Sequence, residues 1–562
     1  MVRGHRPAGT VEPVSAPTPG SPGSPGSPGS RGHDAVVVGA GHNGLVAANL
    51  LADAGWSVLV LEQQDQVGGA VRSDTEVHPG FVHDTFSAFY PFAAASPVIA
   101  RLGLEEHGLR WQHPPAPLGH PFPDGGWALV HPDREDTAAG LEAEHPGDGE
   151  AWLDLCRTWD RVGGPLLGAL LDPFPPVRGG ARLLSRLPGA GGLHLVRELL
   201  TPAGSFGAQR FGGRGARTLI AGSAGHADIP LDATGSGAFG LIMTMLAQHV
   251  GFPVPEGGAG RLTEAMARRL ETRGGQVLLG TEVTSIDVEG GRAVAVRTRE
   301  GERYAAGRAV VADVSAPLLF GRLLDPDDLP ARVVRGMSSF ELDPATVKVD
   351  WALSGPIPWA QAPAVAPGSF HVGDSLAELQ GSLAEVAAGG VPQRPFLLAG
   401  QMTTTDPTRS PAGTESLWAY THVPQSVGAA WGRDEVERFG DRVESRLEEL
   451  APGFGSRVLA RRVLGPRDLQ ERNASLIGGA VNGGTSQLHQ MLVLRPVPGL
   501  GRPETGIGGL YLGSSSAHPS GGVHGAPGAN AARAALLHHR LHAPVRAGAG
   551  VRALLGRAAP DG

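Results

Sequence analysis

The chain has 562 residues, a formal net charge of −8 and a sequence pI of about 6.2. This mildly acidic balance gives no basic footprint for nucleic acid, so nucleic acid is excluded as an expected partner. A single cysteine, Cys156, excludes an intrachain disulfide, a CxxC redox pair and a cysteine-based zinc site, and we expect no metal site.

The two ends of the chain have biased compositions. Residues 1–32 repeat Ser-Pro-Gly between Ser21 and Gly29 and carry almost no apolar side chains. Such a segment cannot bury enough apolar surface to offset its ordering entropy, so residues 1–32 are predicted to be a disordered N-terminal tail. Residues 541–562 are rich in Ala, Gly and Arg and are predicted to be a flexible C-terminal tail.

Residues 33–62 carry the pattern of a β-α-β unit. A buried-strand pattern, HDAVVV, leads into the turn GAGHNG, and apolar residues at helical spacing follow from Leu45. A second apolar strand, WSVLVL, ends immediately before Glu62. An acidic residue about 20 residues after a glycine-rich turn is typical of a dinucleotide-binding unit.

Individual residues of this unit have physical roles in binding a dinucleotide. Gly39 permits the tight turn, Gly41 lets the backbone approach a pyrophosphate, and Gly44 lets helix and strand pack closely. Asn43 lies in the same turn, where the following helix presents free N–H groups to the diphosphate. Glu62 is expected to accept hydrogen bonds from an adenosine ribose, and its charge would repel the 2′-phosphate of NADP.

The middle of the chain predicts helices and mixed sheet. Helical patterns at residues 150–161 and 235–250 are separated by Pro/Gly loops, and a mixture of Leu and Arg fills residues 163–205. We interpret residues 163–205 as a helical lid over a substrate cavity, and an amphipathic surface in peripheral contact with a membrane is the alternative. An α/β rhythm returns at residues 255–315, and residues 340–500 predict sheet mixed with helix.

The C-terminal region carries a second strand-loop-helix pattern. The strand LYL ends at Gly513, small residues follow, and a helix is predicted to begin near Pro527. Glycine-rich segments at both ends of the chain indicate one extended cofactor, FAD rather than NAD, and the loop has no cysteine for a covalent link. The helix N-terminus would stabilise the negative charge of reduced flavin. The expected flavin contacts are Val523, His524, Gly525 and Ala526.

Four stretches, GAGHNGL, LVLEQQDQVGGAVRS, GFVHDTFSAFYP and the C-terminal LYLGSSSAHPSGGVHGAPGANAARAAL, resemble the superfamily of FAD-dependent amine oxidases and phytoene desaturases. Within it, the chain is most similar to the phytoene dehydrogenase-like branch of pyridine nucleotide-disulphide oxidoreductase domain proteins. The resemblance implies that Gly68 and Gly69 lie against the cofactor and that Val283 contacts the adenine through its backbone. The arginine that usually follows the glycine pair is replaced by Ala70, and Arg72 is a candidate to take its place, with no role at the cofactor as the alternative.

The resemblance also implies the fold. We expect an α/β protein whose Rossmann-type FAD-binding domain, of the glutathione reductase-like kind, is discontinuous in sequence. Its three pieces are residues 33–90, 255–330 and 500–540. An inserted α+β substrate-binding and lid region is expected to occupy residues 91–254 and 331–499.

The function that these features predict is that of an FAD-dependent oxidoreductase with non-covalent FAD. It would dehydrogenate or isomerise a hydrophobic small molecule by hydride transfer to flavin N5, with O₂, a quinone or another acceptor reoxidising the flavin. A flavin amine oxidase is an alternative, which the aromatic content of only 5% disfavours, and a non-catalytic regulatory or scaffold protein is another. Because no run of about 20 apolar residues is present, we expect a cytoplasmic protein, with membrane association as the alternative.

The sequence assigns no catalytic residue and no oligomeric state. Lys348 stands in the strand-like run TVKVDW, where a solvated strand-edge lysine is favoured over a buried lysine near flavin. Several other polar residues are candidates, but no spacing argument supports any of them: Asp84, His226, Asp228, Asp350, His422 and His489.

Overall fold

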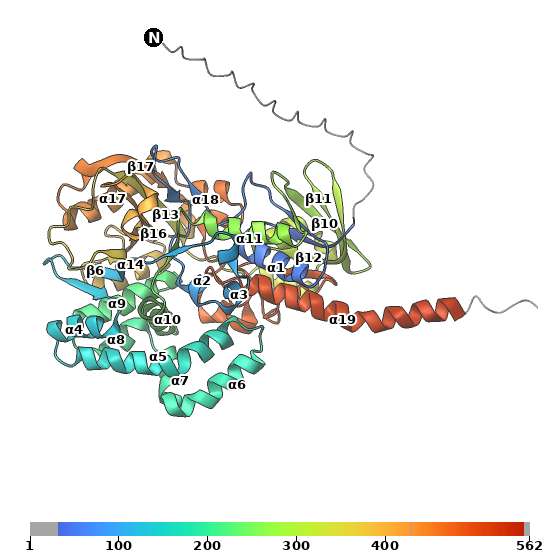
Figure 1. Ribbon diagram of the computed structural model, residues 1–562, viewed down its shortest axis with the longest axis horizontal. Helices are drawn as coiled ribbons and strands as arrows, with labels where there is room; N and C mark the ends of the chain where they lie inside the picture. Colours follow the sequence, from blue (N-terminus) through green and yellow to red (C-terminus); the bar gives the residue numbers. More distant parts are fainter. Residues whose placement is uncertain (1–31, 429, 556–562) are drawn as a thin grey trace, which may run out of the picture.

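The computed structural model describes residues 32–428 and 430–555. Residues 1–31, nearly all of the predicted N-terminal tail, and residues 556–562 lie outside the described residues. Two seven-stranded sheets organise the described chain, and Figure 1 shows them in two neighbouring lobes.

The first sheet has a parallel core built from segments far apart in the sequence. β1 lies in its centre, between β2 and β12. β2 and the last four residues of β1 are unbroken apolar runs because both of their faces are buried. Side chains of β1 alternate between two core clusters, with Val37 on the side of α1 and Val36 on the opposite side. In order across the sheet, the parallel strands are β9 (Gln276–Leu278), β2 (Val58–Leu61), β1 (His33–Val38), β12 (Arg303–Ala312) and β18 (Leu510–Leu512).

An antiparallel ribbon extends this sheet, and helices cover it. β10 (Val283–Glu289) and β11 (Arg292–Thr298) continue from the N-terminal half of β12. On one face, α1 (His42–Asp53) packs against α11 (Gly260–Thr272) and α19 (Ala526–Leu555). Figure 1 shows α19 leaving the lobe as a long projecting helix, so helix continues past residue 541, where the flexible C-terminal tail was expected to begin.

The second sheet is mixed and has seven strands. In order across the sheet, its strands are β17 (Val458–Leu464), β13 (Ala345–Leu353), β16 (Glu415–Val423), β15 (Leu397–Gln401), β14 (Pro367–Val372), β6 (Ala116–Pro121) and β7 (Trp127–Val130).

Short strands and helices connect or flank the two sheets. They include β3 (Ser73–Asp74), β4 (His83–Asp84), β5 (Trp111–Gln112), β8 (Val254–Pro255), α12 (Ala316–Leu318), α13 (Ala331–Met337), α15 (Met402–Thr405) and α18 (Pro466–Arg472).

The two faces of the second sheet differ in polarity because side chains alternate along each strand. On one face, Val347, Val349 and Trp351 of β13 pack in an apolar cluster with α17 (Arg433–Leu450). The opposite face carries polar and aromatic side chains, with Lys348 of β13 paired in register with Tyr420 of β16. The residues of β13 and β16 on this second face are Thr346, Lys348, Asp350, Trp418, Tyr420 and His422.

Helices cover the polar face and one end of the second sheet. α5 and α10 lie in one apolar cluster with strands β6 and β7, and α9 packs against Leu398 of β15. Among the residues that the structure describes, no helix is both long enough and apolar enough to span a bilayer. Besides α17, the helices of this lobe are α4 (Arg134–Glu144), α5 (Asp148–Leu171), α6 (Val177–Arg186), α7 (Leu193–Leu200), α8 (Ala203–Arg210), α9 (Arg214–Ala224), α10 (Ser236–His249), α14 (Leu376–Ala387) and α16 (Gln425–Gly428). The short helices α2 (Pro91–Ala95) and α3 (Pro97–Ala100) pack in the core cluster of the first sheet.

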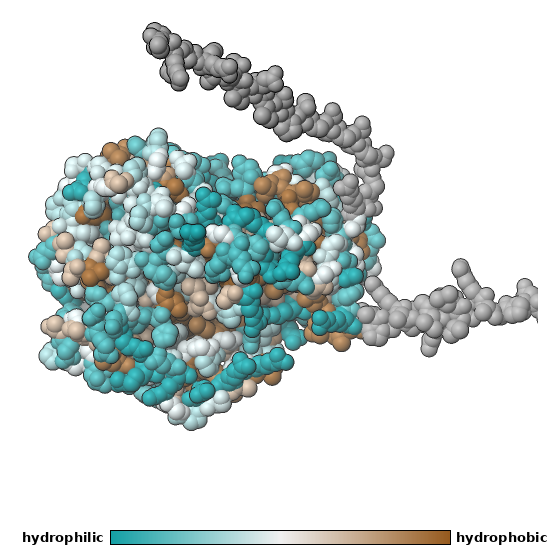
Figure 2. Space-filling view, viewed as in Figure 1, coloured by the Kyte–Doolittle hydropathy of each residue, from teal (hydrophilic) through white to brown (hydrophobic). Residues whose placement is uncertain are grey.

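The surface is mainly hydrophilic on the face drawn in Figure 2, where hydrophobic residues form small separate groups. Exposed apolar side chains occur on α6 and α7, which lie at the lower edge of Figure 1. Val177, Leu184 and Leu193 are 73%, 68% and 87% exposed. The segment predicted as lid or membrane surface therefore has apolar residues on its outer side.

Candidate functional site

A cavity of about 1060 Å³ is lined by residues from both sheets. This volume lies just above the usual range for small-molecule sites, as expected for a cavity that holds both a cofactor and a substrate. Val38, Leu61 and Asp313, at the carboxyl ends of the parallel strands β1, β2 and β12, all line it. Ligands of open α/β sheets bind at this edge, so the cavity lies where the fold predicts a ligand.

The first glycine turn forms one wall of the cavity. Gly39 has φ +96°, a left-handed conformation that favours glycine, and its amide donates to the carbonyl of Leu61 at 2.8 Å. A Cβ on Gly44 would overlap the carbonyl oxygen of Gly39, and one on Gly41 would lie 2.5 Å from Oδ2 of Asp313. Side chains at these positions would therefore fill the space beside the N-terminus of α1.

The two glycine-rich ends of the chain meet at this turn. A Cβ on Gly528, in the first turn of α19, would overlap the carbonyl oxygen of Asn43 in α1. Gly68 and Gly69 also pack there, because the Gly68 amide donates to Ala40 at 2.9 Å. The predicted N-terminal and C-terminal motifs thus contribute to one continuous surface.

Glu62 is buried at the end of β2 and lines the cavity. Its Oε2 accepts a hydrogen bond from the amide of Ala40 at 2.8 Å, and Oε1 accepts from the amide of Gln64 at 2.9 Å. Burial raises the pKa of Glu62, and these two amides oppose that rise. Each carboxylate oxygen retains a second lone pair, so the side chain can still accept hydrogen bonds from a ligand. Val283, at the start of β10, lines the same part of the cavity.

Asp313 is a site residue that the sequence analysis missed. Its Oδ2 accepts a hydrogen bond from the amide of Gly44 at 2.7 Å, inside the first turn of α1. Burial raises the pKa of Asp313 to about 7; the Gly44 amide lowers it and the charge of Glu62 raises it further. An acidic residue directly after the apolar run AVVA was the available signal.

Arg72 lies outside the cavity wall. Its Nη2 donates to the carbonyl oxygen of Arg472 at 2.7 Å, and its guanidinium lies 5.3 Å from the ring centroid of Phe86. Of the predicted cofactor residues, some line the cavity and the others lie behind its wall. Those that line it are Gly39, Gly41, Asn43, Glu62, Gly69, Val283, Val523 and His524. Those outside the wall are Gly44, Gly68, Arg72, Gly513, Gly525 and Ala526.

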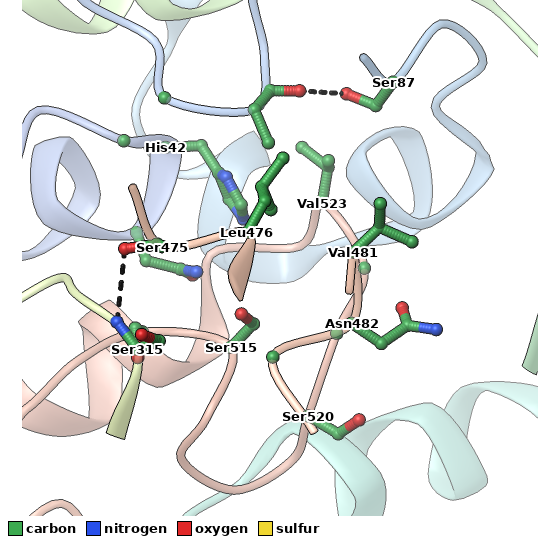
Figure 3. A pocket seen from close by; sticks show the side chains of 18 of the residues that line it. His42, Ser87, Ser315, Ser475, Leu476, Val481, Asn482, Ser515, Ser520 and Val523 are labelled. Carbon is green, nitrogen blue, oxygen red and sulfur yellow. Dashed lines mark hydrogen bonds between the residues drawn. The ribbon is translucent and has the colours of Figure 1, made fainter. Parts of the chain in front are cut away.

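The C-terminal loop forms the next part of the wall. His524 is buried, its Nδ1 accepts from the amide of Ala526 at 3.1 Å, and burial lowers its pKa to about 3. Burial also lowers the pKa of His42 to about 4. Because both pKa values are so low, the imidazoles of His42 and His524 are neutral groups beside the cavity. Figure 3 shows His42, Leu476 and Val523, from three distant parts of the sequence, around the same space.

The wall carries buried polar atoms that fit a cofactor. His42 Nε2, Asn43 Oδ1 and Ser315 Oγ have no hydrogen-bond partner among the described residues, and all three residues line the cavity. Buried polar atoms in native proteins are nearly always satisfied. Together with the open space beside the glycine turn, these atoms indicate that a polar ligand completes this part of the site.

Lys348 corrects one expectation. It is only 2% exposed and lines the cavity, because β13 is an interior strand between β16 and β17. Its ammonium forms an ion pair with Asp350 and lies 6.0 Å from the ring centroid of Trp418. Burial lowers the pKa of Lys348, and Asp350 opposes this. The prediction of a solvated strand-edge lysine was wrong.

The other polar candidates from the sequence lie in different parts of the structure, some at the cavity and some not. His226 lines the cavity, and Nε2 of His422 lies 2.6 Å from Oδ1 of Asp228 just behind the wall. Asp84 is buried in an ion pair with Arg409 and does not line the cavity. Asp350 is held by Lys348 and Arg462, and His489 is half exposed, beside Glu341 at 3.2 Å. In the described part of the chain, no group of three or more metal-ligating side chains could hold a metal ion.

Aromatic residues gather around the cavity. Phe89 lies 6.1 Å from Trp418 between ring centroids, and Trp418 stacks on Tyr420 at 5.8 Å. The low aromatic content of the whole chain disfavours an amine substrate, but the aromatic residues are concentrated at the cavity, so that argument loses its force here. The aromatic residues that line the cavity are Phe86, Phe89, Tyr90, Phe92, Phe239, Phe252, Trp418 and Tyr420.

Comparison with known proteins agrees with this geometry. Residues 37–102 match the model of an NAD(P)-binding Rossmann-like domain, and residues 203–536 match that of flavin containing amine oxidoreductases. The chain is 30% identical to pyridine nucleotide-disulfide oxidoreductase domain-containing protein 2 of Rattus norvegicus, over 89% of this chain and 92% of the relative. It is 25% identical to a neurosporene-forming phytoene desaturase of Cereibacter sphaeroides, over 88% and 92% of the two chains. Cyclohexylamine oxidase from Brevibacterium oxydans has the same fold, with 17% identity and a TM-score of 0.53 over 91% of this chain and all of that one.

Proposed function

The chain belongs to the family of flavin containing amine oxidoreductases and is an FAD-dependent oxidoreductase, and from this premise we propose that it dehydrogenates or isomerises a hydrophobic small molecule. One observation carries the proposal. A single cavity runs from the glycine turn at Gly41 to an apolar wall formed by α5 and α10. A cofactor at one end and a substrate at the other would share this space.

The chain's own residues suit the cofactor along the whole cavity. The glycine turn and the N-terminus of α1 would hold the diphosphate, because unpaired N–H groups and the helix dipole favour an anion. Glu62 and Val283 would hold the adenosine, and the 523–526 loop would lie at the flavin ring. FAD, when bound, supplies the atom that accepts a hydride. The lone Cys156 lies in α5, in a core cluster, which supports non-covalent binding.

The strand order supports a glutathione reductase-like subtype for the cofactor domain. The antiparallel ribbon β10–β11 is joined to the parallel sheet by β12. The first half of β12 pairs with β11, and its second half pairs with β1. β18, from the C-terminal piece of the domain, pairs with β12 on the edge opposite β1. We infer that residues 33–90, 255–330 and 500–540 act as one cofactor-binding unit.

Apolar residues of the helical region support a hydrophobic substrate. Leu166 and Leu170 of α5 and Phe239, Ile242 and Met243 of α10 line the cavity. α5 therefore covers the cavity as a lid would. The outer side of the next helices carries exposed Leu and Arg side chains, which supports peripheral contact with a membrane as the route for an apolar substrate.

Lys348 is the side chain that we propose donates and accepts a proton at the substrate end of the cavity. Its ammonium has three donors, and Asp350 accepts from one of them. Because burial disfavours the charged form, the side chain can release and recover a proton more readily than an exposed lysine. Asp350 stays satisfied in either state, because Arg462 also donates to it at 2.7 Å.

A flavin amine oxidase is the second candidate, favoured by the aromatic wall around Trp418 and Tyr420. Anaerobic mixing of the purified holoprotein with a panel of apolar alkenes and of amines separates the two. Bleaching of the flavin by alkenes and not by amines supports the first candidate, and the reverse result supports the second. A colourless holoprotein that binds only NAD would contradict both.

A further inference from the structure

The substrate end of the cavity has a polar wall that an unfunctionalised hydrocarbon would leave unsatisfied. This wall is the face of the second sheet that carries Thr346, Lys348 and Tyr420, together with Ser369 of β14 and His226 of the turn η3 (Gly225–Ala227), all of which line the cavity. Apolar helices form the opposite side. One side of the substrate space is therefore built for hydrogen bonds and the other for apolar contact.

Two groups of this wall have free hydrogen-bonding atoms. Among the described residues, no side chain or backbone group bonds to the Tyr420 hydroxyl, whose ring is held between Trp418 and His422 at centroid distances of 5.8 and 5.5 Å. His226 uses Nε2 to pair with Nε2 of His371 at 3.1 Å, which leaves Nδ1 without a described partner. The rings are thus fixed while one polar atom of each remains available.

We propose that the substrate carries one uncharged hydrogen-bonding head group, a hydroxyl or its carbonyl counterpart, on an apolar body, and that His226 and Tyr420 bind this head. The inference rests on the proposed function. A site with fixed polar groups rejects an analogue that lacks the matching group, because those groups then stay unpaired. The apolar body would lie against α5 and α10.

The charges around the wall indicate that the head is uncharged. The carboxylates that line the cavity are Glu62, Glu282 and Asp313, and all three belong to the cofactor end. Behind the wall, Asp228 is already paired with His422 and accepts from Asn482 at 2.5 Å. An ammonium head would therefore find no free carboxylate among the described residues of this wall.

The remaining charged groups of the wall also disfavour a cation. The Lys348 ammonium lies beside the Trp418 ring and would repel a second cation there. Burial and the neighbouring His422 lower the pKa of His226 to about 3, so its imidazole is neutral. A neutral imidazole can accept from a hydroxyl or, as the other tautomer, donate to a carbonyl.

The polar wall is tied to the loop proposed to hold the flavin. Asn482, which bonds to Asp228, lines the cavity, and a Cβ on Gly521 of the C-terminal loop would overlap its side chain. Figure 3 shows Asn482 and Ser520 on neighbouring stretches of chain at the edge of the cavity. The head group would therefore lie at the cofactor end of the substrate space.

The test uses the FAD-loaded full chain and three probes: pentylbenzene, phenylbutanol and phenylbutylammonium. These differ only in whether a methyl, a hydroxyl or an ammonium group ends the same phenylbutyl chain. Dissociation constants are measured by titration of flavin absorbance and by calorimetry. We expect phenylbutanol to bind roughly 100-fold more tightly than pentylbenzene, because two buried groups gain partners.

Three variants locate the effect. Tyr420→Phe and His226→Phe should each remove most of the preference for phenylbutanol while pentylbenzene binding stays unchanged. Tyr304→Phe is the matched control, because Tyr304 lies on β12 outside the cavity lining and its hydroxyl bonds to Glu302. It should keep the full preference.

Several outcomes would overturn the proposal. Equal binding of pentylbenzene and phenylbutanol, tightest binding of phenylbutylammonium, binding of none of the three, or an unchanged preference in Tyr420→Phe each does so. FAD content is measured first on every sample. A chain that holds no FAD contradicts the proposed function itself, whereas a chain that holds FAD without discriminating the probes contradicts only this inference.

Discussion

The carboxylate of Asp313 accepts a hydrogen bond from the backbone amide of Gly44 at 2.7 Å, although 269 positions separate the two residues. This amide belongs to the first turn of α1, where a helix in a dinucleotide-binding unit offers its unpaired N–H groups to a diphosphate. The chain thus places its own anion in the position proposed for the cofactor's anion. We therefore expect the binding of FAD and the charge state of Asp313 to be coupled.

The affinity of the apoprotein for FAD should fall as pH rises through about 7. The pKa of Asp313 is raised to about 7, so the carboxyl is mostly neutral below that pH and anionic above it. The anion would repel the diphosphate, so the dissociation constant should rise by up to about tenfold per pH unit above 7, the limit for one linked proton. Fluorescence titration of FAD between mildly acidic and mildly alkaline pH measures this slope.

Asp313→Asn should bind FAD with an affinity independent of pH across the same range. Asp328→Asn is the matched control, because Asp328 is an exposed carboxylate after β12 and should retain the wild-type slope. A wild-type affinity that does not change with pH, or a slope that persists in Asp313→Asn, would show that Asp313 does not face the diphosphate.

Glu62→Ala should weaken FAD binding by roughly 1–3 kcal/mol, the range for losing a charge-assisted hydrogen-bond acceptor. The variant also leaves the amides of Ala40 and Gln64 without the carboxylate that accepts from them, so the glycine turn should lose order. Glu62→Gln keeps one acceptor oxygen and should lose less. Equilibrium dialysis of FAD with all three proteins checks this order, and equal affinities would remove Glu62 from the cofactor site.

Gly41→Val should abolish most FAD binding while the chain still folds. Its Cβ would lie 2.5 Å from the flexible carboxylate of Asp313, which can move, but the added methyl groups would occupy the space proposed for the pyrophosphate. Gly140→Val, where nothing lies within 4 Å of the new Cβ, controls for a glycine-to-valine exchange at a position away from the cavity. Full FAD occupancy in a well-folded Gly41→Val protein would contradict the placement.

Replacing Leu184 and Leu193 by Glu should abolish binding to anionic vesicles without changing FAD content. Both side chains are more than two-thirds exposed, and α6 adds Arg178, Arg182 and Arg186 that would attract anionic lipid. Leu459→Glu, at an exposed position of the second sheet, is the control. Vesicle co-sedimentation decides the matter, and a wild-type chain that stays in the supernatant rules out this membrane contact.

The sequence predicted the local parts of the site because each motif folds within a short stretch. The turn at Gly39 and the acid at Glu62 are recognisable from spacing alone, since strand, turn, helix and strand follow one another directly. Asp313 escaped because its partner Gly44 is distant in sequence and only the pairing of β12 with β1 brings them together. No local pattern records that pairing.

Lys348 shows the same limit more sharply. The run TVKVDW alternates polar and apolar residues, which is the pattern of a strand with one face in water. The alternation is real, and Val347 and Val349 do pack on α17. The polar face, however, borders the cavity and is shielded by the helical region, so alternation in one strand could not distinguish solvent from an internal polar wall.

Lys348→Met should leave FAD content unchanged and slow reduction of the flavin by substrate roughly 100-fold, the low end of the range for one positioned proton-transfer group. Methionine fills a similar volume, and Arg462 still neutralises Asp350, so the sheet should fold. Lys348→Arg keeps the charge but cannot release a proton, so it separates the two roles. If Arg restores the rate, Lys348 acts through its charge. If Arg is as slow as Met, the mobile proton is what matters. Stopped-flow reduction that is equally fast in Lys348→Met and the wild type would place the reacting atoms away from β13.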